Sequence, residues 1–105
     1  MSGEANMTTK EMVRSNTKVR VEPPKSYNVF VLNDDETPMD LVVAILAHVF
    51  HKDVNKAISI MLEADKSGSA FVGEYTYDIA NTRVRKAKDL SNMNGYDLNF
   101  RIEEA

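Results

Sequence analysis

The sequence predicts an α+β fold, in which helices pack on one face of a small antiparallel sheet within a single domain. The chain has 105 residues, of which 43% are hydrophobic and 28% are charged, and this size and composition suit one compact core. Short strand-like runs and longer runs of helical period follow one another in the order βααβαβ. So few strands cannot form a doubly wound sheet, and the helices are therefore expected on one face of the sheet only.

Residues 1–26 are expected to form a flexible N-terminal extension, followed by the folded domain at residues 27–105. The extension has few large apolar side chains and no aromatic one, and it ends in Pro23-Pro24, which favours extended backbone. It carries 5 basic and 3 acidic side chains, whereas residues 27–105 carry 8 basic and 13 acidic ones. The sequence leaves open whether this basic extension is an inert tail or a functional arm.

The composition excludes several classes of function. Without cysteine, the chain has no disulfide, no thiolate metal site and no thiol nucleophile. The acidic domain does not attract phosphate backbones, so nucleic acid is not an expected partner. No apolar run approaches the roughly 20 residues that span a bilayer, and residues 1–26 lack the apolar stretch of a secretory signal. We therefore expect no membrane association and a location in the cytoplasm, or in an organelle after import.

The first strand is predicted at residues 27–32, Tyr-Asn-Val-Phe-Val-Leu, a short run of β-branched and aromatic residues. A helix is predicted from Thr37 to about Phe50. Thr37 is placed as its N-cap, Pro38 as its first residue and Asp40 as the partner in a capping box. The expected inward stripe of this helix consists of Met39, Val42, Val43, Leu46, Val49 and Phe50.

The second helix is predicted to begin after its N-cap, Asp53, and to end at Gly68. Its expected inward stripe consists of Val54, Ala57, Ile58, Met61 and Leu62. Asp65 falls on the same stripe, at a helix end where the macrodipole disfavours an anion. We expect this carboxylate either to reach solvent at the rim of the apolar face or to have a cationic partner.

The second strand is predicted at residues 70–75, and the third helix from Thr76 or Tyr77 to Asn94-Gly95. The expected inward positions of this helix are Ile79, Ala80, Val84, Ala87 and Leu90. The last strand is predicted at residues 97–103, where the apolar residues Leu98, Phe100 and Ile102 alternate with polar ones. This alternation predicts a half-buried strand with one face in water.

The densest group of polar residues is the segment Asn33-Asp34-Asp35-Glu36-Thr37, between a predicted strand and a predicted helix. Such a segment can bind a cation, or it can be a solvated turn whose negative charge stabilises the helix N-terminus. It lacks the loop length, alternating ligands and mid-loop glycine of a calcium site. It also lacks an adjacent nucleophile, so paired-carboxylate catalysis is not expected.

Two further pairs of residues could carry chemistry. His48 and His51 lie three apart and could share a metal, but without a third ligand they are expected to act as helix-dipole partners. We therefore expect neither a metal site nor a cofactor. Met39 and Met61 could line a pocket that adapts to different apolar groups, or they could pack in the core.

Several motifs together resemble the ClpS adaptor family. The most specific is Asn-Asp-Asp-Glu-Thr-Pro-Met at residues 33–39, and the likeness covers about residues 22–105. Other matching segments are Ile60-Met61-Leu62-Glu63, Gly73-Glu74-Tyr75-Thr76-Tyr77 and Ala80-Asn81-Thr82-Arg83-Val84. The resemblance implies a monomeric adaptor, not an enzyme, that binds N-degrons, meaning an unblocked Leu, Phe, Tyr or Trp at the N-terminus of a substrate protein. The adaptor would deliver the substrate to the N-terminal domain of a Clp AAA+ unfoldase, of the ClpA or ClpC type, for degradation.

The resemblance also implies roles for individual residues. The residues around the α-ammonium and the first peptide group would be Asn33, Asp34, Asp35 and Thr37. The pocket for the first side chain would be lined by Met39, Val42, Met61, Ala64 and Leu98. The residues that contact the unfoldase would be Asp78, Thr82 and Arg83. Among the pocket residues, Met39 would act as a gate against β-branched first residues.

Two positions depart from the family pattern. Asp65 stands where the family usually has a histidine that hydrogen-bonds the α-ammonium. An aspartate could replace that bond with an ion pair, or it could weaken or redirect N-degron capture. Ala64 stands where valine is common, so a wider pocket that favours aromatic first residues is expected. The departure at Asp65 leaves an alternative function, a regulator that docks on the unfoldase and modulates or blocks it without binding N-degrons.

Overall fold

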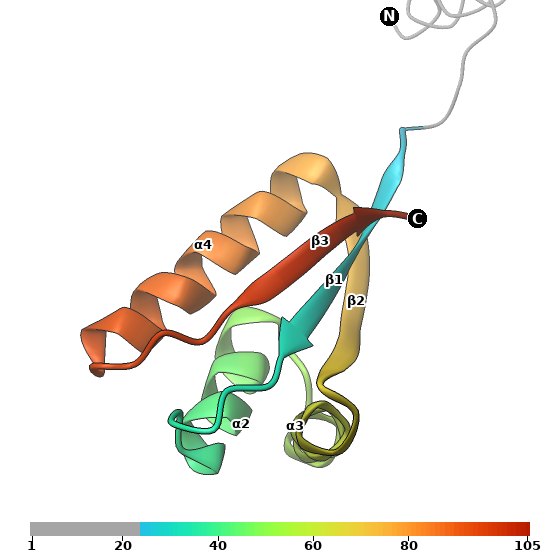
Figure 1. The fold of residues 1–105 in the computed structure, drawn as a ribbon. Coiled ribbons are helices and arrows are strands. Elements are labelled where there is room, and N and C mark those ends of the chain that lie inside the picture. Colours follow the sequence, from blue (N-terminus) through green and yellow to red (C-terminus); the bar gives the residue numbers. More distant parts are fainter. Residues whose placement is uncertain (1–23) are drawn as a thin grey trace, which may run out of the picture.

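The computed structural model describes residues 24–105, which fold in the expected βααβαβ order (Figure 1). The strands are β1 (Ser26–Leu32), β2 (Ser69–Thr76) and β3 (Phe100–Glu104). The helices are α2 (Met39–Val49), α3 (Val54–Ser67) and α4 (Tyr77–Met93). The expected N-terminal extension lies almost wholly outside the described residues. Within residues 24–105, none of the helices has the length and apolar character needed to cross a bilayer.

The strands form one antiparallel sheet in the order β2-β1-β3, with β1 at its centre. Successive residues of β1 point to opposite faces, so Val29 and Val31 are buried against the helices. On the other face, Phe30 pairs with Phe71 of β2 and Arg101 of β3. Figure 1 shows α4 running along the sheet, with α2 and α3 gathered at the end where β1 stops. The predicted α+β fold, with helices on one face of the sheet, is confirmed.

Side chains from the sheet and from all the described helices meet in one core. Its largest fully buried apolar members are Ile45, Leu46, Leu98, Val29, Val31 and Val72. The buried positions of α4 are small, namely Ala80, Ala87 and Ser91, and this lets the helix approach the sheet closely. The Ser91 hydroxyl accepts a 2.9 Å hydrogen bond from the Leu98 backbone N–H, so the buried hydroxyl is paired. This bond also holds Leu98 beside the end of β1.

The start of α2 differs from the prediction. Pro38, not Thr37, is the N-cap, and its carbonyl oxygen accepts the N–H of Leu41 at 3.1 Å. The Thr37 hydroxyl lies in the preceding turn and donates to Asp34, and the helix has no side-chain cap hydrogen bond. Asp40 accepts a hydrogen bond from the adjacent N–H of Leu41 instead of reaching back to the cap, so the predicted capping box does not form.

The caps of α3 agree with the prediction, but its inward face does not. Asp53 accepts the Lys56 N–H at 2.8 Å, and Gly68 ends the helix with a left-handed φ of 94°. The buried residues are Ala57, Ile60, Met61 and Ala64. The residues wrongly predicted to face inward are Val54, Ile58 and Leu62, which are exposed. The small alanines let this face of α3 pack against α2 and β2. The larger apolar residues therefore lie on the opposite, outward face of the helix.

Three further predictions need correction. Met39, expected on the inward stripe of the first helix, is 54% exposed at the start of α2. Ile79, expected in the core, is 45% exposed on the first turn of α4. The last strand begins at Phe100 rather than at residue 97, because the Leu98 N–H is bonded to Ser91 and not to a strand. Pairing between the strands still reaches back to Asn99, whose carbonyl oxygen accepts the N–H of residue 32 at 2.9 Å.

Candidate functional site

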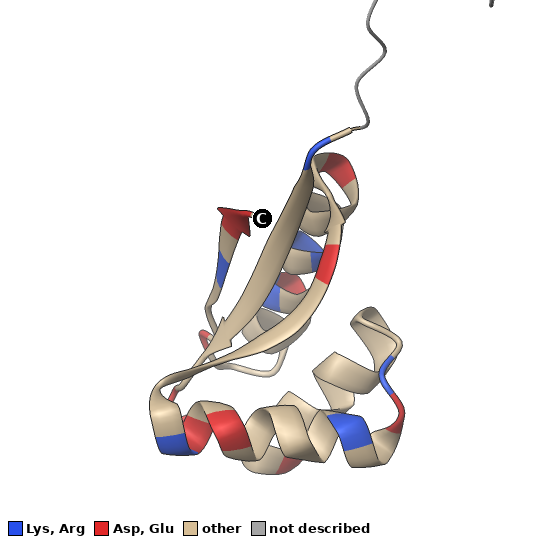
Figure 2. Cartoon of the chain, turned by 90° about the vertical axis from the view of Figure 1, so that its right-hand side faces the viewer, with Lys and Arg blue, Asp and Glu red and all other residues tan. Residues whose placement is uncertain are grey.

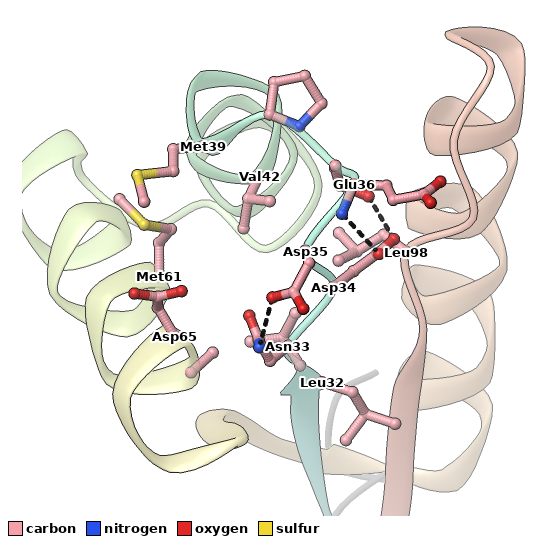
Figure 3. Close-up of a pocket in the computed structure, with 14 residues that line it drawn as sticks. Leu32, Asn33, Asp34, Asp35, Glu36, Met39, Val42, Met61, Asp65 and Leu98 are labelled. Carbon is pink, nitrogen blue, oxygen red and sulfur yellow. Dashed lines mark hydrogen bonds between the residues drawn. The ribbon is translucent and has the colours of Figure 1, made fainter.

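A cavity of about 250 Å³ opens at the end of β1, between the turn of residues 33–38, α2 and α3 (Figure 3). The residues that the sequence assigned to N-degron binding all line it: Asn33, Asp34, Asp35, Thr37, Met39, Val42, Met61, Ala64, Asp65 and Leu98. The lining residues that the sequence did not assign are Val31, Leu32, Glu36 and Pro38. The volume is several times the roughly 30 Å³ of one water molecule, so the cavity can hold an organic side chain.

The floor and one wall of this cavity are apolar. Val42 and Leu98 form the floor, and both are buried. Met39 from α2 and Met61 from α3 extend into the cavity from two different helices (Figure 3). Met39 is 54% exposed and lies at the mouth, whereas Met61 is 9% exposed and lies deeper. Because thioether side chains are unbranched and flexible, this wall can adapt to apolar groups of different shape.

The opposite wall is the turn after β1, which is braced by Asp34. The Thr37 hydroxyl donates to Asp34 Oδ2 at 2.6 Å, and the Glu36 backbone N–H donates to Oδ1 at 3.0 Å. Both hydrogen bonds hold the pKa of Asp34 below its ordinary value, and the bond from Thr37 has the larger effect. The carboxylate therefore stays ionised. The Asn33 side-chain amide donates to Asp35 at 3.3 Å, which leaves the Asn33 amide oxygen available as an acceptor.

Negative charge dominates the polar part of the lining. Its carboxylates are those of Asp34, Asp35, Glu36 and Asp65, and no described lysine or arginine lines the cavity. Asp65 is exposed at the rim, which is one of the two alternatives expected from the sequence. Its carboxylate lies across the opening from Asn33 and Asp35 (Figure 3). Within residues 24–105, no group of three or more His, Cys, Asp and Glu side chains is placed to hold a metal ion. The lining thus places an excess of negative charge next to an apolar surface.

A second hollow, of about 350 Å³, lies on α4 and is called the α4 hollow below. The residues assigned to unfoldase binding line it together, namely Asp78, Thr82 and Arg83. The residues that the sequence did not assign to this surface are His48, Val49, His51, Ile79 and Lys86. Figure 2 shows basic and acidic residues interspersed along α4. The lysine and arginine of the α4 hollow, Lys86 and Arg83, stand beside Asp78, whereas the cavity at the end of β1 is lined by carboxylates without a described lysine or arginine, so the two hollows differ in charge as well as in position.

Arg83 is fixed in the α4 hollow by two contacts. Its guanidinium group donates a 2.8 Å hydrogen bond to the Val49 carbonyl oxygen at the end of α2. The same group lies 5.4 Å from the centre of the Tyr75 ring. Burial raises the pKa of Tyr75, and the positive charge of Arg83 opposes that rise. Arg83 therefore joins α4 to α2 and β2, so it has a structural role besides any contact with a partner.

Known proteins resemble this chain in sequence and in fold. The family model described as ATP-dependent Clp protease adaptor protein ClpS matches residues 22–101. The ATP-dependent Clp protease adapter protein ClpS of Nautilia profundicola is 43% identical over 98 residues, which are 93% of this chain and 99% of that protein. The protein of the same name from Acetivibrio thermocellus is 47% identical over 78 residues, which are 74% of this chain and 79% of that protein.

A solved structure agrees with these matches. The structure of Agrobacterium tumefaciens ClpS2 bound to L-phenylalaninamide has 37% sequence identity and a TM-score of 0.76, and the match covers 79% of this chain and 100% of that one. The residues matched by the family model include both the turn of residues 33–38 and the two methionines of the cavity. On this agreement of sequence, fold and length, the chain belongs to the ClpS family of ATP-dependent Clp protease adaptors.

Proposed function

We propose that the protein is an adaptor without catalytic activity, which binds an unblocked N-terminal Leu, Phe, Tyr or Trp of a substrate protein and delivers the substrate to a Clp AAA+ unfoldase. The observation that carries the proposal is the cavity at the end of β1, where carboxylates and an amide oxygen adjoin an apolar hole. An unblocked N-terminus has the matching features, because its first Cα carries both an ammonium group and a side chain. Agrobacterium tumefaciens ClpS2 binds L-phenylalaninamide, a small amine with an aromatic side chain, which supports this assignment.

The α-ammonium group is proposed to bind between the turn of residues 33–38 and α3. An α-amino group has a pKa of about 7.7 to 8.0, so it is mostly protonated at neutral pH. Asn33, Asp34 and Asp35 would accept its hydrogen bonds, which are worth roughly 1.5 to 3 kcal/mol each. Asp34 can accept one more although both of its oxygens are in use, because a carboxylate has about four lone-pair sites. Thr37, whose hydroxyl donates to Asp34, keeps its own lone pairs for the first peptide N–H.

The first side chain of the substrate is proposed to fill the apolar hole. The residues that surround it there are Met39, Val42, Met61, Ala64 and Leu98. Burial of a Leu or Phe side chain contributes about 1.5 to 3 kcal/mol. Together with two or three polar contacts, and after the costs of ordering, this gives an affinity in the micromolar range. Met39 at the mouth would act as a gate against β-branched residues, and Ala64 leaves room for aromatic ones.

Asp65 is proposed to form an ion pair with the same α-ammonium group, in place of the hydrogen bond made by the family histidine. Its exposed carboxylate lies across the opening from Asn33 and Asp35, where the ammonium group would sit. The same carboxylate favours a second candidate function, a regulator that occupies the unfoldase without binding N-degrons. When an apolar side chain enters the cavity, the carboxylate at the rim loses part of its hydration, which costs free energy. This cost would disfavour binding of an N-degron.

The unfoldase, of the ClpA or ClpC type, is proposed to bind the α4 hollow through Asp78, Thr82 and Arg83. The α4 hollow shares no lining residue with the cavity at the end of β1. A partner on α4 therefore leaves the cavity open to a substrate, as delivery requires. Each site is complete within one chain, so a monomer suffices. The adaptor would act where its unfoldase acts, in the cytoplasm or in an organelle.

A pair of matched peptides tests the proposed function. We expect a peptide that begins with Phe to bind the full chain with micromolar affinity in calorimetry, and its N-acetylated twin not to bind. Acetylation removes the positive charge and leaves the aromatic side chain unchanged, so the pair isolates the ammonium group. Equal binding of the two peptides would show that the carboxylates around the cavity do not recognise an N-terminus.

A further inference from the structure

The methionines of the described residues differ in their access to solvent. Met39 is the first residue of α2 and is 54% exposed at the mouth of the cavity, whereas Met61 is 9% exposed within it. Met93 is 81% exposed at the end of α4 and lines neither the cavity nor the α4 hollow. Because the chain has no cysteine, thioethers are its most readily oxidised side chains. Met39 thus combines an oxidisable sulfur, exposure to solvent and a place in the candidate site.

A hydroperoxide can oxidise Met39 without any unfolding of the protein. The sulfur gives two electrons to the peroxide and forms a bond to one of its oxygen atoms, while the O–O bond breaks. The other oxygen leaves as water when the oxidant is hydrogen peroxide, and the product is methionine sulfoxide. The core residues of α2, Ile45 and Leu46, are fully buried below this position and are not touched by the reaction. Sulfoxide reductases return the side chain to the thioether.

The new oxygen would be poorly accommodated in this cavity. A sulfoxide oxygen is a hydrogen-bond acceptor, and the carboxylates of Asp35 and Asp65, which face the opening of the same cavity, are acceptors too (Figure 3). The Thr37 hydroxyl proton is already donated to Asp34. A first residue that covers oxidised Met39 would therefore bury a polar group without a partner, next to like charge.

We propose that Met39 is a site of reversible oxidation by hydroperoxides, and that its sulfoxide form has a reduced affinity for apolar N-terminal residues. The proposal rests on the proposed function, because it assumes that the cavity holds the first side chain of a substrate. Of the other apolar residues that line the cavity, Met61 alone can be oxidised in this way, and it is shielded from solvent. The exposed thioether of Met39 would therefore control the site.

The experiment compares peptide binding before and after a limited treatment with hydrogen peroxide. The full chain is oxidised until mass spectrometry finds one oxygen on Met39, with Met61 still reduced, and the affinity for a peptide beginning with Phe is measured. We expect the affinity to fall about tenfold or more and to return after treatment with reductases for both sulfoxide epimers. Met39→Leu, whatever its affinity when untreated, is expected to keep that affinity after peroxide. Met93→Leu is expected to lose affinity as the unsubstituted protein does.

The outcomes separate the inference from the proposed function. If the untreated protein does not bind the peptide, the proposed function and the inference are both wrong. If the untreated protein binds and the protein oxidised at Met39 binds equally well, only the inference is wrong. A similar loss of affinity in Met39→Leu after peroxide would also overturn the inference, because it would place the sensitive sulfur elsewhere in the chain.

Discussion

The hydroxyl of Thr37 donates a 2.6 Å hydrogen bond to Oδ2 of Asp34, so the residue expected to cap α2 instead braces the turn that precedes it. Thr37 is 6% exposed, and the turn carries Asn33 and Asp35 on the side of the cavity (Figure 3). The hydrogen bond between Thr37 and Asp34 therefore helps to fix the positions of the neighbouring acceptor groups of Asn33 and Asp35. Loss of the hydroxyl proton in this hydrogen bond is therefore expected to lower both the stability of the turn and the affinity of the cavity for a peptide.

Replacing Thr37 with Val keeps the shape of the side chain and removes that proton. We expect Thr37→Val to lower the free energy of unfolding by about 1 to 2 kcal/mol, because a hydrogen bond to a charged acceptor is lost. Affinity for a peptide that begins with Phe should fall as well, because the turn loosens and because the hydroxyl oxygen proposed to accept the first peptide N–H is removed. Urea unfolding and calorimetry measure the two effects. Thr76→Val is the matched control, since the side chain of Thr76 makes no cap hydrogen bond at the start of α4. An equal effect of both substitutions would contradict the bracing role.

The lowered pKa of Asp34 predicts a dependence of stability on pH. The hydrogen bonds from Thr37 and Glu36 stabilise the ionised form, so the pKa in the folded protein lies below the ordinary value of 3.8. The stabilising contribution is fully present above that ordinary value and is lost as pH falls through the lower pKa of the folded protein. Asp34→Asn lacks this group. The difference in unfolding free energy between the unsubstituted protein and Asp34→Asn should therefore shrink as the pH is lowered from about 5 to about 3. A difference that stays constant over this range would contradict the assignment.

The sequence predicted the order of the elements and the lining of the cavity better than the faces that the helices bury. Residues 33–39 form one contiguous motif, so their resemblance to a family places them together without any knowledge of packing. In α3, Val54, Ile58 and Leu62 form as regular a stripe as the residues that are buried. Periodicity cannot choose between two such stripes. The choice depends on which side chains are small enough to lie against α2 and β2, and this is a property of the tertiary structure.

The local errors have a similar cause. Thr37, Pro38 and Asp40 have the pattern of a helix start, but the pattern does not show that the Thr37 hydroxyl is bonded to Asp34 in the turn and that Pro38 is the N-cap. Ile79 belongs to an apolar stripe of α4, and only the position of α4 on the sheet shows that it opens into the α4 hollow. In both cases a contact outside the helix decides the outcome, so the pattern within the helix is not sufficient.

The alanine at position 64 predicts the preference of the cavity among first residues. Ala64→Val adds two methyl groups to the lining of a cavity of about 250 Å³. We expect the affinity for peptides beginning with Trp or Phe to fall about fivefold relative to a peptide beginning with Leu, because overpacking affects the largest side chains most. Calorimetry with three peptides that differ only in residue one provides the measurement. An equal loss for all three peptides would show that Ala64 does not set the width of the cavity.

The contact of Arg83 with Tyr75 can be measured through the tyrosine itself. Burial raises the pKa of Tyr75 and the charge of Arg83 opposes the rise, so Arg83→Gln should raise this pKa further. The shift is measured from phenolate absorbance during an alkaline titration, with Tyr75→Phe used to identify the signal of Tyr75. Arg85→Gln is the matched control, because Arg85 is exposed on the same helix. If Tyr75 titrates at the same pH in Arg83→Gln and in the unsubstituted protein, the guanidinium group does not lie over the ring in solution.

Asp65 offers the sharpest distinction between the adaptor and the regulator, because the two functions predict opposite effects of its replacement. If its carboxylate pairs with the α-ammonium group, Asp65→Asn should weaken binding of a peptide beginning with Phe about two- to fivefold at low salt, as expected for an exposed ion pair. The effect should diminish at high salt, where the charges are screened. Glu63→Gln removes a charge from the same helix outside the cavity and should leave the affinity unchanged.

For a regulator, the carboxylate at the rim opposes the entry of an apolar side chain, so its removal should strengthen binding. Asp65→His would then produce a large gain in affinity, whereas an adaptor that already uses Asp65 would gain little. Neither substitution is expected to disturb the fold, because Asp65 is exposed at the end of α3 and the buried face of that helix is formed by other residues. A gain in both variants would therefore assign Asp65 to the exclusion of N-degrons, and a loss in Asp65→Asn alone would assign it to their capture.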